Sequence, residues 1–292
     1  DCFLAETERL GIEIKTSHSV QNIEKHEKNW LVKTSKGDFS AEKIVIATGS
    51  NPKIWKLLEQ LGHQIIQPVP SLFTFNIQDH RIKDLAGIST FAHIKILDEK
   101  LESDGPLLIT HWGLSGPGIL KLSAWGARIL EARNYHFKIQ VNWLGYTTSE
   151  EVIEQLKKLK IEFAKQQLTT YAQFNLPKRL WLSLLNATKI PETQKWAGLS
   201  KRQMLQLARE LTECQLTVNG KSTFKEEFVT AGGVDLKEVN FKTFESKIEP
   251  KLYLAGEVLN IDAITGGFNF QNAWTGGFLA AQAISKSIED ED

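Results

Sequence analysis

The chain has 292 residues, 41% of them hydrophobic, and its 35 basic residues are balanced by 35 acidic ones. This length exceeds the roughly 100–200 residues of one domain, so two domains are expected, and the apolar share is enough for a core. The balanced charge leaves no basic footprint, so we expect a small-molecule substrate as partner, no nucleic acid and no membrane. Only Cys2 and Cys214 are present, which excludes a disulfide framework and favours a reducing cytoplasm.

The N-terminal region, residues 1–71, is expected to combine a short helix with strands. The elements predicted there are a helix at residues 3–10, meander strands at 18–24 and 30–34, a turn at 35–38 and an apolar strand at 43–49. The last strand ends in Ala47, Thr48 and Gly49. A glycine at this position lets the backbone turn sharply and approach a ligand.

The middle of the chain, residues 72–231, reads as an insertion with two parts. Residues 72–147 are expected to form a small β-barrel, from apolar runs at 72–77, 90–96, 106–110 and 136–143 that Gly, Asp and Pro separate. Residues 148–213 are expected to be helical. Capping boxes are predicted for Thr148 with Glu151 and Ser200 with Gln203, and helix starts at Pro177 and Pro191. This helical part carries no catalytic signature, so we assign it to packing, to capping of the barrel or to a subunit contact.

The C-terminal region, residues 232–292, joins a strand, a glycine turn and a helix. Residues 251–255 read as a buried strand, and an apolar repeat of helical spacing follows the Gly266-Gly267 pair; its members are Phe270, Trp274, Phe278, Ala281 and Ile284. This connectivity is ordinary in α/β proteins. It also suits a planar ligand, because paired glycines admit a close backbone approach and the free N–H groups of a helix start favour negative charge.

Five motifs carry a resemblance to a known family. They are residues 46–49 (Ile-Ala-Thr-Gly), 68–72 (Pro-Val-Pro-Ser-Leu), 110–120 (beginning Thr-His-Trp-Gly), 230–234 (Thr-Ala-Gly-Gly-Val) and 254–269 (from Leu-Ala-Gly-Glu to Gly-Gly-Phe-Asn). In this order, the chain resembles, nearly end to end, the BaiN-like or YhiN-like family of bacterial NAD(FAD)-utilizing dehydrogenases. The resemblance implies an α/β fold in which residues 1–71 and 232–292 form part of a two-dinucleotide-fold FAD domain around an insertion domain of residues 72–231.

The resemblance also implies a flavoprotein that binds FAD, with NAD(P)H as a further cofactor, and that transfers hydride or electrons to or from an unknown small molecule. Flavin-dependent RNA modification and a non-catalytic binding module remain as alternatives. The family's Gly-x-Gly-x-x-Gly loop is absent from this sequence. We therefore expect a C-terminal fragment that binds FAD weakly or not at all.

The candidate cofactor-binding residues follow from these motifs: Val20, Ala47, Thr48, Gly49, Gly256, Glu257, Asp262, Gly266, Gly267, Phe268 and Asn269. Glu257 is expected to accept a hydrogen bond from a ribityl hydroxyl, with a solvated strand-end carboxylate as the alternative. Val20 is expected either to offer its backbone to the adenine or to be a plain core residue. His111, in a loop stiffened by Gly and Pro, is the candidate catalytic acid or base, with a structural turn histidine equally open. No metal site is expected.

Overall fold

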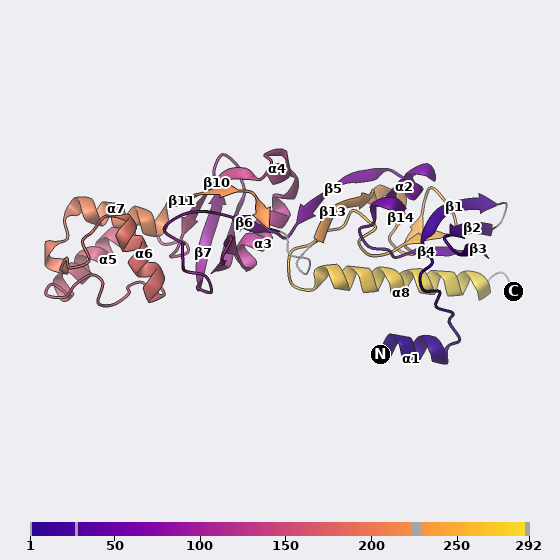
Figure 1. Ribbon diagram of the computed structural model, residues 1–292, viewed down its shortest axis with the longest axis horizontal. Helices are drawn as coiled ribbons and strands as arrows, with labels where there is room; N and C mark the ends of the chain where they lie inside the picture. The colour runs from indigo at the N-terminus through magenta and orange to yellow at the C-terminus, as the bar shows by residue number, and fades with distance from the viewer. Residues whose placement is uncertain (1, 27–28, 223–228, 290–292) are drawn as a thin grey trace. The chain divides into compact units, whose positions relative to one another are not determined.

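The computed structural model describes residues 2–26, 29–222 and 229–289 and divides the chain into two compact units (Figure 1). Unit 1 comprises Asp1–Gln67, Gly232–Ile261 and Phe270–Asp292, and unit 2 comprises Pro68–Ala231 and Asp262–Asn269. The chain passes between the units in β5 (Ile65–Ser71) and β13 (Val229–Val234), which pair as a two-stranded sheet.

Unit 1 contains two further sheets. The first is the predicted meander, an antiparallel sheet of β1 (Val20–His26), β2 (Asn29–Thr34) and β3 (Gly37–Ala41). The second has the order β14 (Val239–Asn240), β15 (Glu245–Ser246), β16 (Leu252–Leu254) and β4 (Ile44–Ile46). Only the β16–β4 pair in it is parallel, and the pair joins two segments that are about 200 positions apart in the sequence.

Three α-helices and one 3₁₀ turn belong to unit 1: α1 (Cys2–Arg9), α2 (Pro52–Gln60), most of α8 (Phe268–Glu289) and η2 (Leu236–Glu238). The start of α2 is well specified, because the side chain of Asn51 accepts hydrogen bonds from the N–H groups of Lys53 and Ile54 and a proline follows it. Its buried face adds Trp55 and Leu58 to a core that also holds Trp30 of β2. The local sequence therefore determines where α2 begins, and the core determines how it packs.

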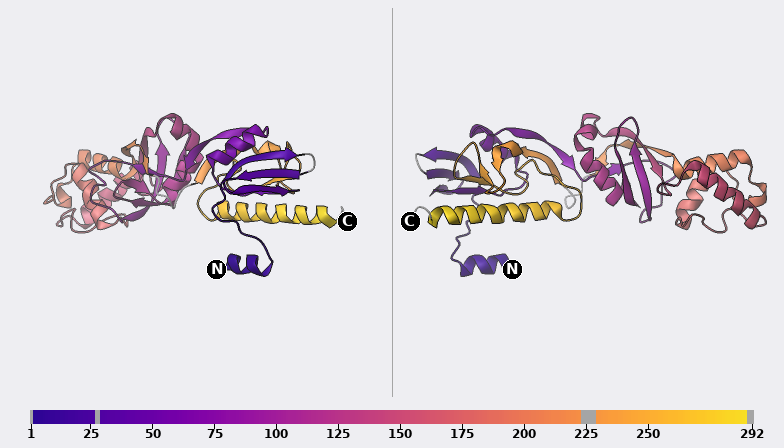
Figure 2. Two further views of the ribbon diagram at one scale, coloured as in Figure 1. Left: turned by 45° about the vertical axis from the view of Figure 1, so that its right-hand side comes forward. Right: turned by 180° about the vertical axis from the view of Figure 1, so that it is seen from behind.

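The C-terminal helix α8 forms where it was predicted, and it runs alongside the strands of unit 1 in every view (Figures 1 and 2). The aromatic members of the predicted apolar repeat do not face the core. Phe270, Trp274 and Phe278 are 73%, 69% and 62% exposed, whereas Ala280 is fully buried. Leu279, Ala283 and Ile284 also pack against the core. At the closest approach the helix has glycine, since a Cβ at Gly276 would lie 2.7 Å from the ring of Phe244. Close approach to the core thus selects small side chains instead of the largest ones.

Unit 2 contains a seven-stranded antiparallel sheet of barrel-like form. Its order is β11 (Cys214–Asn219), β10 (His136–Asn142), β7 (Ser89–Ile96), β8 (Glu102–Ile109), β9 (Gly113–Ser115), β6 (Thr74–Asn76) and β12 (Lys221–Ser222). The first strand of this order also contacts β6 near the other end, so the sheet curls back toward itself. The prediction of a β part is confirmed for β6, β7, β8 and β10. It missed β9, β11 and β12, two of which return to the sheet after the helical part.

The helices of unit 2 are α3 (Pro117–Trp125), α4 (Ala127–Ala132), α5 (Ser149–Glu162), α6 (Lys178–Ala187) and α7 (Lys201–Thr212), with a 3₁₀ turn at η1 (Trp196–Gly198). Both predicted capping boxes form, at the starts of α5 and α7. Pro177 is the N-cap of α6, as predicted. The prediction for Pro191 was wrong, because its carbonyl accepts from the N–H of Gln194 in a turn and no helix begins there.

Candidate functional site

Five of the predicted cofactor residues meet at one edge of the unit 1 sheet. The parallel register places Ile44 opposite Leu252 and Ile46 opposite Leu254, and the N–H of Ala255 donates to the carbonyl of Ile46 over 3.0 Å. Because the carboxyl ends of parallel strands lie at the same edge, the residues that follow the two strands come together there. These residues are Ala47, Thr48, Gly49, Gly256 and Glu257.

Polar and conformational details at this edge hold Glu257 in place. The hydroxyl of Ser50 donates to Oε2 of the half-buried Glu257 over 3.2 Å. Gly49 and Gly256 have φ values of 64° and 76°, which only glycine adopts without strain. A Cβ at Gly256 would touch that of Ala273 on α8 at 3.5 Å, whereas a Cβ at Gly49 would meet no described atom within 4 Å. This edge therefore combines a fixed carboxylate with backbone that a ligand can approach closely.

The glycine pair in residues 230–234 supports the segment that carries Glu257. Gly233 has a φ of 122°, and a Cβ there would lie 2.5 Å from the carbonyl oxygen of Val258. The neighbouring Val234 donates its N–H to Val258 over 3.0 Å and accepts from the N–H of Asn260 over 3.0 Å. The side chain of Trp55 also donates to the carbonyl of Val258, over 2.9 Å. This motif thus has a structural role beside the site.

Val20 opens β1, where its half-buried side chain packs against the core of unit 1. The ladder with β2 shifts register between Val20 and Asn22. This placement matches the alternative of a core valine and leaves the proposed adenine contact as a prediction.

The remaining predicted cofactor residues lie in the Asp262–Asn269 segment of unit 2. Asn269 closes this loop, because its side chain accepts from the N–H of Ala263 over 2.9 Å and donates to the carbonyl of Ala263 over 3.0 Å. Oδ2 of Asp262 accepts from the hydroxyl of Ser71 over 3.1 Å. Gly267 has a φ of 83°, and a Cβ on it would meet no described atom within 4 Å. Among these residues, the Gly267 backbone is the part that a planar ligand could approach.

The ring of Phe268 restricts which residue can stand at position 266 of the same turn. Gly266 has a φ of 134°, and a Cβ there would lie 2.9 Å from the ring of Phe268, which is itself exposed. The turn before α8 therefore requires glycine at residue 266 for two separate reasons, a positive φ and the ring beside it.

His111 lies in the turn between β8 and β9, and its side chain is exposed. Together with Asp79, His80, Lys83 and Arg179 it lines an open cleft of about 750 Å³ in unit 2. This cleft and Asp262 lie near opposite ends of β6. The bond partner of Asp262 precedes the strand, whereas the N–H of Ile77, which follows it, donates to the carbonyl of Trp112 over 2.9 Å. Within unit 2, His111 is therefore not brought next to the glycine turn.

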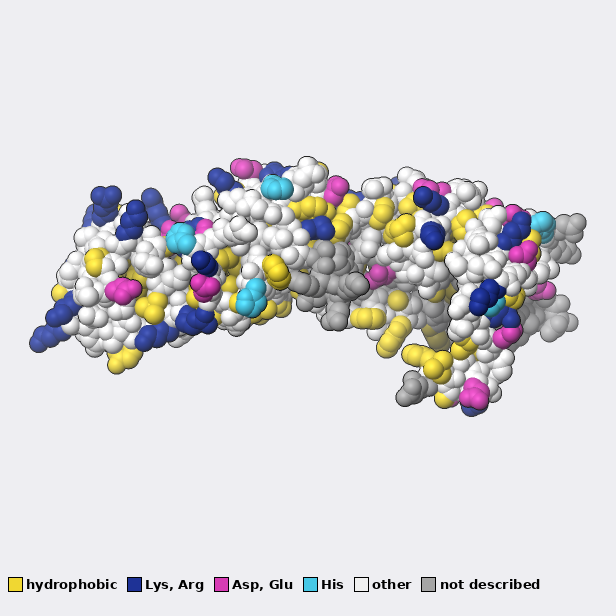
Figure 3. Space-filling view, in the orientation of Figure 1, with side chains coloured by type: hydrophobic (Ala, Val, Ile, Leu, Met, Phe, Trp, Pro, Cys, Tyr) yellow, Lys and Arg dark blue, Asp and Glu magenta, His cyan; other side chains and the backbone are white. Residues whose placement is uncertain are grey.

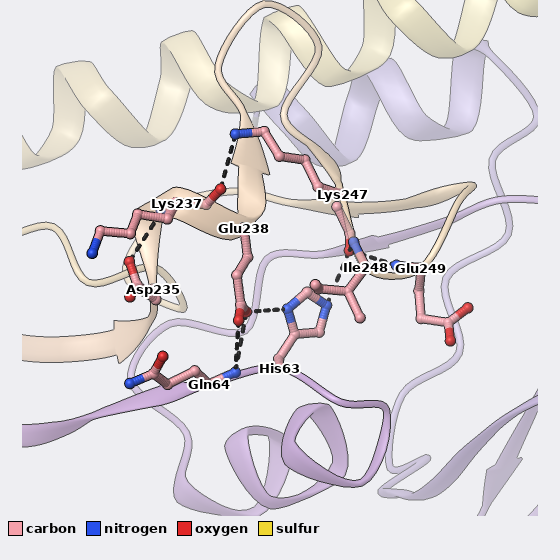
Figure 4. Close-up of polar contacts among 9 residues, drawn as sticks. His63, Gln64, Asp235, Lys237, Glu238, Lys247, Ile248 and Glu249 are labelled. Carbon is pink, nitrogen blue, oxygen red and sulfur yellow. Dashed lines mark hydrogen bonds and ion pairs between the residues drawn. The ribbon is translucent and has the colours of Figure 1, made fainter.

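A buried polar network that the sequence analysis missed lies in unit 1 (Figure 4). His63 contacts Oε2 of Glu238 through Nδ1 at 2.9 Å and the hydroxyl of Ser246 through Nε2 at 3.1 Å. The order Glu, His, Ser matches that of hydrolase triads. However, the serine is only 6% exposed, and its hydroxyl accepts the N–H groups of Ile248 and Glu249. Since both lone pairs of this hydroxyl are used, it donates to His63, and the buried network ties the loops together.

No helix in residues 2–26, 29–222 and 229–289 has the length and apolar character needed to cross a membrane. Within the same residues, no three His, Cys, Asp or Glu side chains are grouped so that they could hold a metal ion.

These features define a mixed α/β protein in which a barrel-like sheet and a helical part are inserted next to a unit with a parallel strand pair. Residues 69–229 match the family model described as HI0933-like protein barrel and H2TH domain. The chain belongs to this HI0933-like family, which includes the BaiN-like and YhiN-like FAD-dependent oxidoreductases. The family prediction made from the five motifs is confirmed, and so is a mixed α/β fold with a barrel-like part.

Alignments with curated relatives cover nearly the whole chain. This chain is 30% identical over 287 residues to a ribosomal RNA dihydrouridine synthase of Haemophilus influenzae, and the alignment covers 95% of this chain and 68% of that protein. It is 28% identical over 295 residues to a 3-dehydro-bile acid delta(4,6)-reductase of Clostridium scindens, covering 96% and 71%. It is 27% identical over 295 residues to a ribosomal RNA dihydrouridine synthase of Escherichia coli K12, covering 97% and 71%.

Proposed function

We propose that this protein is an FAD-dependent oxidoreductase that transfers hydride between its flavin and an unsaturated substrate, with NAD(P)H as the source of electrons. The observation that carries the proposal is the parallel β4–β16 pair, which brings Gly49, Gly256 and Glu257 to one sheet edge. In the proposed site, residues 1–71 and 232–292 are part of a two-dinucleotide-fold FAD domain. When bound, FAD supplies the redox chemistry, and the protein supplies position and electrostatics.

The residues of the chain have distinct parts in this proposal. Glu257, held by Ser50 at 3.2 Å, accepts a hydrogen bond from a ribityl hydroxyl of the cofactor. In unit 1 the open backbone at Gly49 leaves room for ligand atoms where a side chain would stand, and in unit 2 Gly267 does so separately. The sequence has no Gly-x-Gly-x-x-Gly loop, so these residues account for the ribityl and ring contacts and not for the pyrophosphate. His111, which unit 2 does not bring next to the glycine turn, is proposed to orient or protonate substrate in the cleft and not to contact the flavin.

The names of the relatives narrow the reaction class. A dihydrouridine synthase and a delta(4,6)-reductase are both named for adding hydrogen across a carbon–carbon double bond. We infer the same class of reaction for this chain, on a double bond conjugated to a carbonyl. A small unsaturated molecule is the first candidate substrate. A uracil base in RNA is the second, and the two relatives named for ribosomal RNA favour it.

The test is a titration of the full-length protein with FAD, followed by visible absorption. Glu257→Ala should weaken binding by about 1.5–3 kcal/mol, the scale of a hydrogen bond to a charged group. Gly267→Val should abolish retention, because a β-branched residue is strained at a φ of 83° and its side chain would enter the open space. Asp38→Ala, which removes an exposed carboxylate in β3, is the matched control and should bind normally.

The same titration assigns His111. His111→Ala should keep the flavin and, with a substrate in hand, lose on the order of 10²-fold in turnover. Wild-type FAD affinity in Glu257→Ala would remove the cofactor from the sheet edge, and wild-type affinity in Gly267→Val would remove it from the glycine turn.

A further inference from the structure

The helical part of unit 2 is basic although the chain as a whole is neutral. Residues 148–213 contain 11 Lys and Arg against 7 Asp and Glu, whereas the total is 35 against 35. Figure 3 shows Lys and Arg side chains gathered over α5, α6 and α7, with fewer Asp and Glu among them on that face. A neutral total therefore conceals a local excess of positive charge.

Internal pairing leaves most of this positive charge available. Three of the seven acidic side chains are engaged: Glu151 in a helix cap, Glu154 with Lys157, and Glu210 with Arg81. Of the cations in the same part, eight are exposed and make no ion pair with any described residue: Lys158, Lys165, Lys178, Lys189, Lys195, Lys201, Arg202 and Arg209. We call these eight residues the basic surface.

Two features beside the basic surface suit a nucleic-acid strand. Tyr171, in the loop between α5 and α6, is 62% exposed and offers a ring on which a base can stack. The cleft that holds His80, Lys83 and His111 is lined also by Arg179, which follows Lys178 at the start of α6. The cleft also contains two acidic residues, Asp84 and Asp79, and Asp79 shares Arg81 with Glu210. The cleft continues from the basic surface through Arg179.

We propose that the basic surface, with Tyr171 and the adjoining cleft, docks single-stranded RNA. This inference rests on the second candidate substrate of the proposed function, a uracil base in RNA. Cations placed along a surface bind the phosphate backbone by releasing counterions, and an exposed aromatic ring stacks on a base. An enzyme that reduces a base also needs contacts on flanking nucleotides, because the reacting base must leave its stack. The helical part supplies those contacts.

The experiment measures binding of a fluorescent single-stranded RNA of about 20 nucleotides to the full-length protein at several salt concentrations. The test variant is Lys201→Glu with Arg202→Glu, and the matched control is Lys53→Glu with Lys56→Glu on α2. Both pairs are exposed and lie on capped helices, and Lys201, Arg202 and Lys53 stand in the first turn, where an acidic residue favours the helix dipole. Neither variant should therefore lose binding by unfolding.

The expected result is a loss of about 10-fold or more in RNA affinity near 0.1 M salt for the test variant, and a salt slope smaller by about 1.4. The control should bind as wild type does. Tyr171→Ser should weaken binding about 5-fold or more, and Tyr171→Phe should restore it, because stacking needs the ring and not the hydroxyl.

Equal losses in the test and control variants would mean that only overall charge matters, and would overturn the proposal. Salt-independent binding, or none at all by the wild type, would overturn it too. Flavin content is measured on the same samples. If the samples contain flavin but do not bind RNA, only the proposed RNA surface is refuted. If they bind RNA but no sample contains flavin, the proposed oxidoreductase function is refuted.

Discussion

Gly233→Ala tests how closely the β13 backbone must approach the segment that carries Glu257. The added methyl would lie 2.5 Å from the carbonyl oxygen of Val258 and 2.9 Å from the carbonyl carbon of Leu259, both of them backbone atoms that cannot rotate away. A positive φ costs a residue with a side chain about 1–2 kcal/mol, and overpacking typically adds about 1–3 kcal/mol. The free energy of unfolding should therefore fall by about 2–5 kcal/mol.

The matched control is Gly37→Ala at the first residue of β3. Gly37 has a φ of 133°, close to the 122° of Gly233, but a Cβ there meets no described atom within 4 Å. This variant carries the backbone strain without the clash, so it should cost only about 1–2 kcal/mol. Urea unfolding followed by tryptophan fluorescence measures both values, since Trp30 and Trp55 are buried in unit 1.

Flavin retention adds a second readout to this comparison. If the clash is relieved by moving residues 256–260, Glu257 moves with them, so Gly233→Ala should also weaken FAD binding while Gly37→Ala should not. Equal destabilisation by the two variants would refute the reasoning, because it would mean that contact with Val258 contributes nothing beyond the positive φ.

Two further predictions concern buried groups. Burial raises the pKa of the Cys214 thiol to about 12, so one equivalent of a thiol reagent should react with the native protein, at the exposed Cys2, and a second only after unfolding. Because the thiol of the unfolded chain loses its proton at a lower pH than the buried thiol, the free energy of unfolding should fall as the pH rises from about 9 toward 12. Cys214→Ala should reduce this dependence of the unfolding free energy on pH. An unchanged dependence would contradict the burial argument. Ser246→Ala should destabilise unit 1 by about 1–3 kcal/mol, because the N–H groups of Ile248 and Glu249 lose their acceptor. Its FAD affinity should equal that of wild type, and a loss of turnover without a loss of stability would show that the serine does chemistry.

The amino-acid sequence by itself determined the features that depend on near neighbours. The capping box of Thr148 with Glu151 joins residues three positions apart, and it formed as predicted. The sequence also predicted the apolar strand before Ala47, the glycine turn before α8 and the family motifs. These features depend on the spacing of apolar residues and on turn residues, which act within a few positions of one another. The same local signals predicted four strands of the barrel-like sheet.

Only the tertiary structure decided which faces and which distant residues meet. The pattern of α8 is amphipathic, but close packing against Phe244 selects its small residues and leaves Trp274 exposed. His63 and Ser246 are 183 positions apart, so no local period relates them. The return of β11 to the sheet beyond the helical part is likewise set by chain topology. Side-chain periodicity reports which residues prefer burial, whereas packing geometry and electrostatics depend on what the fold brings into contact.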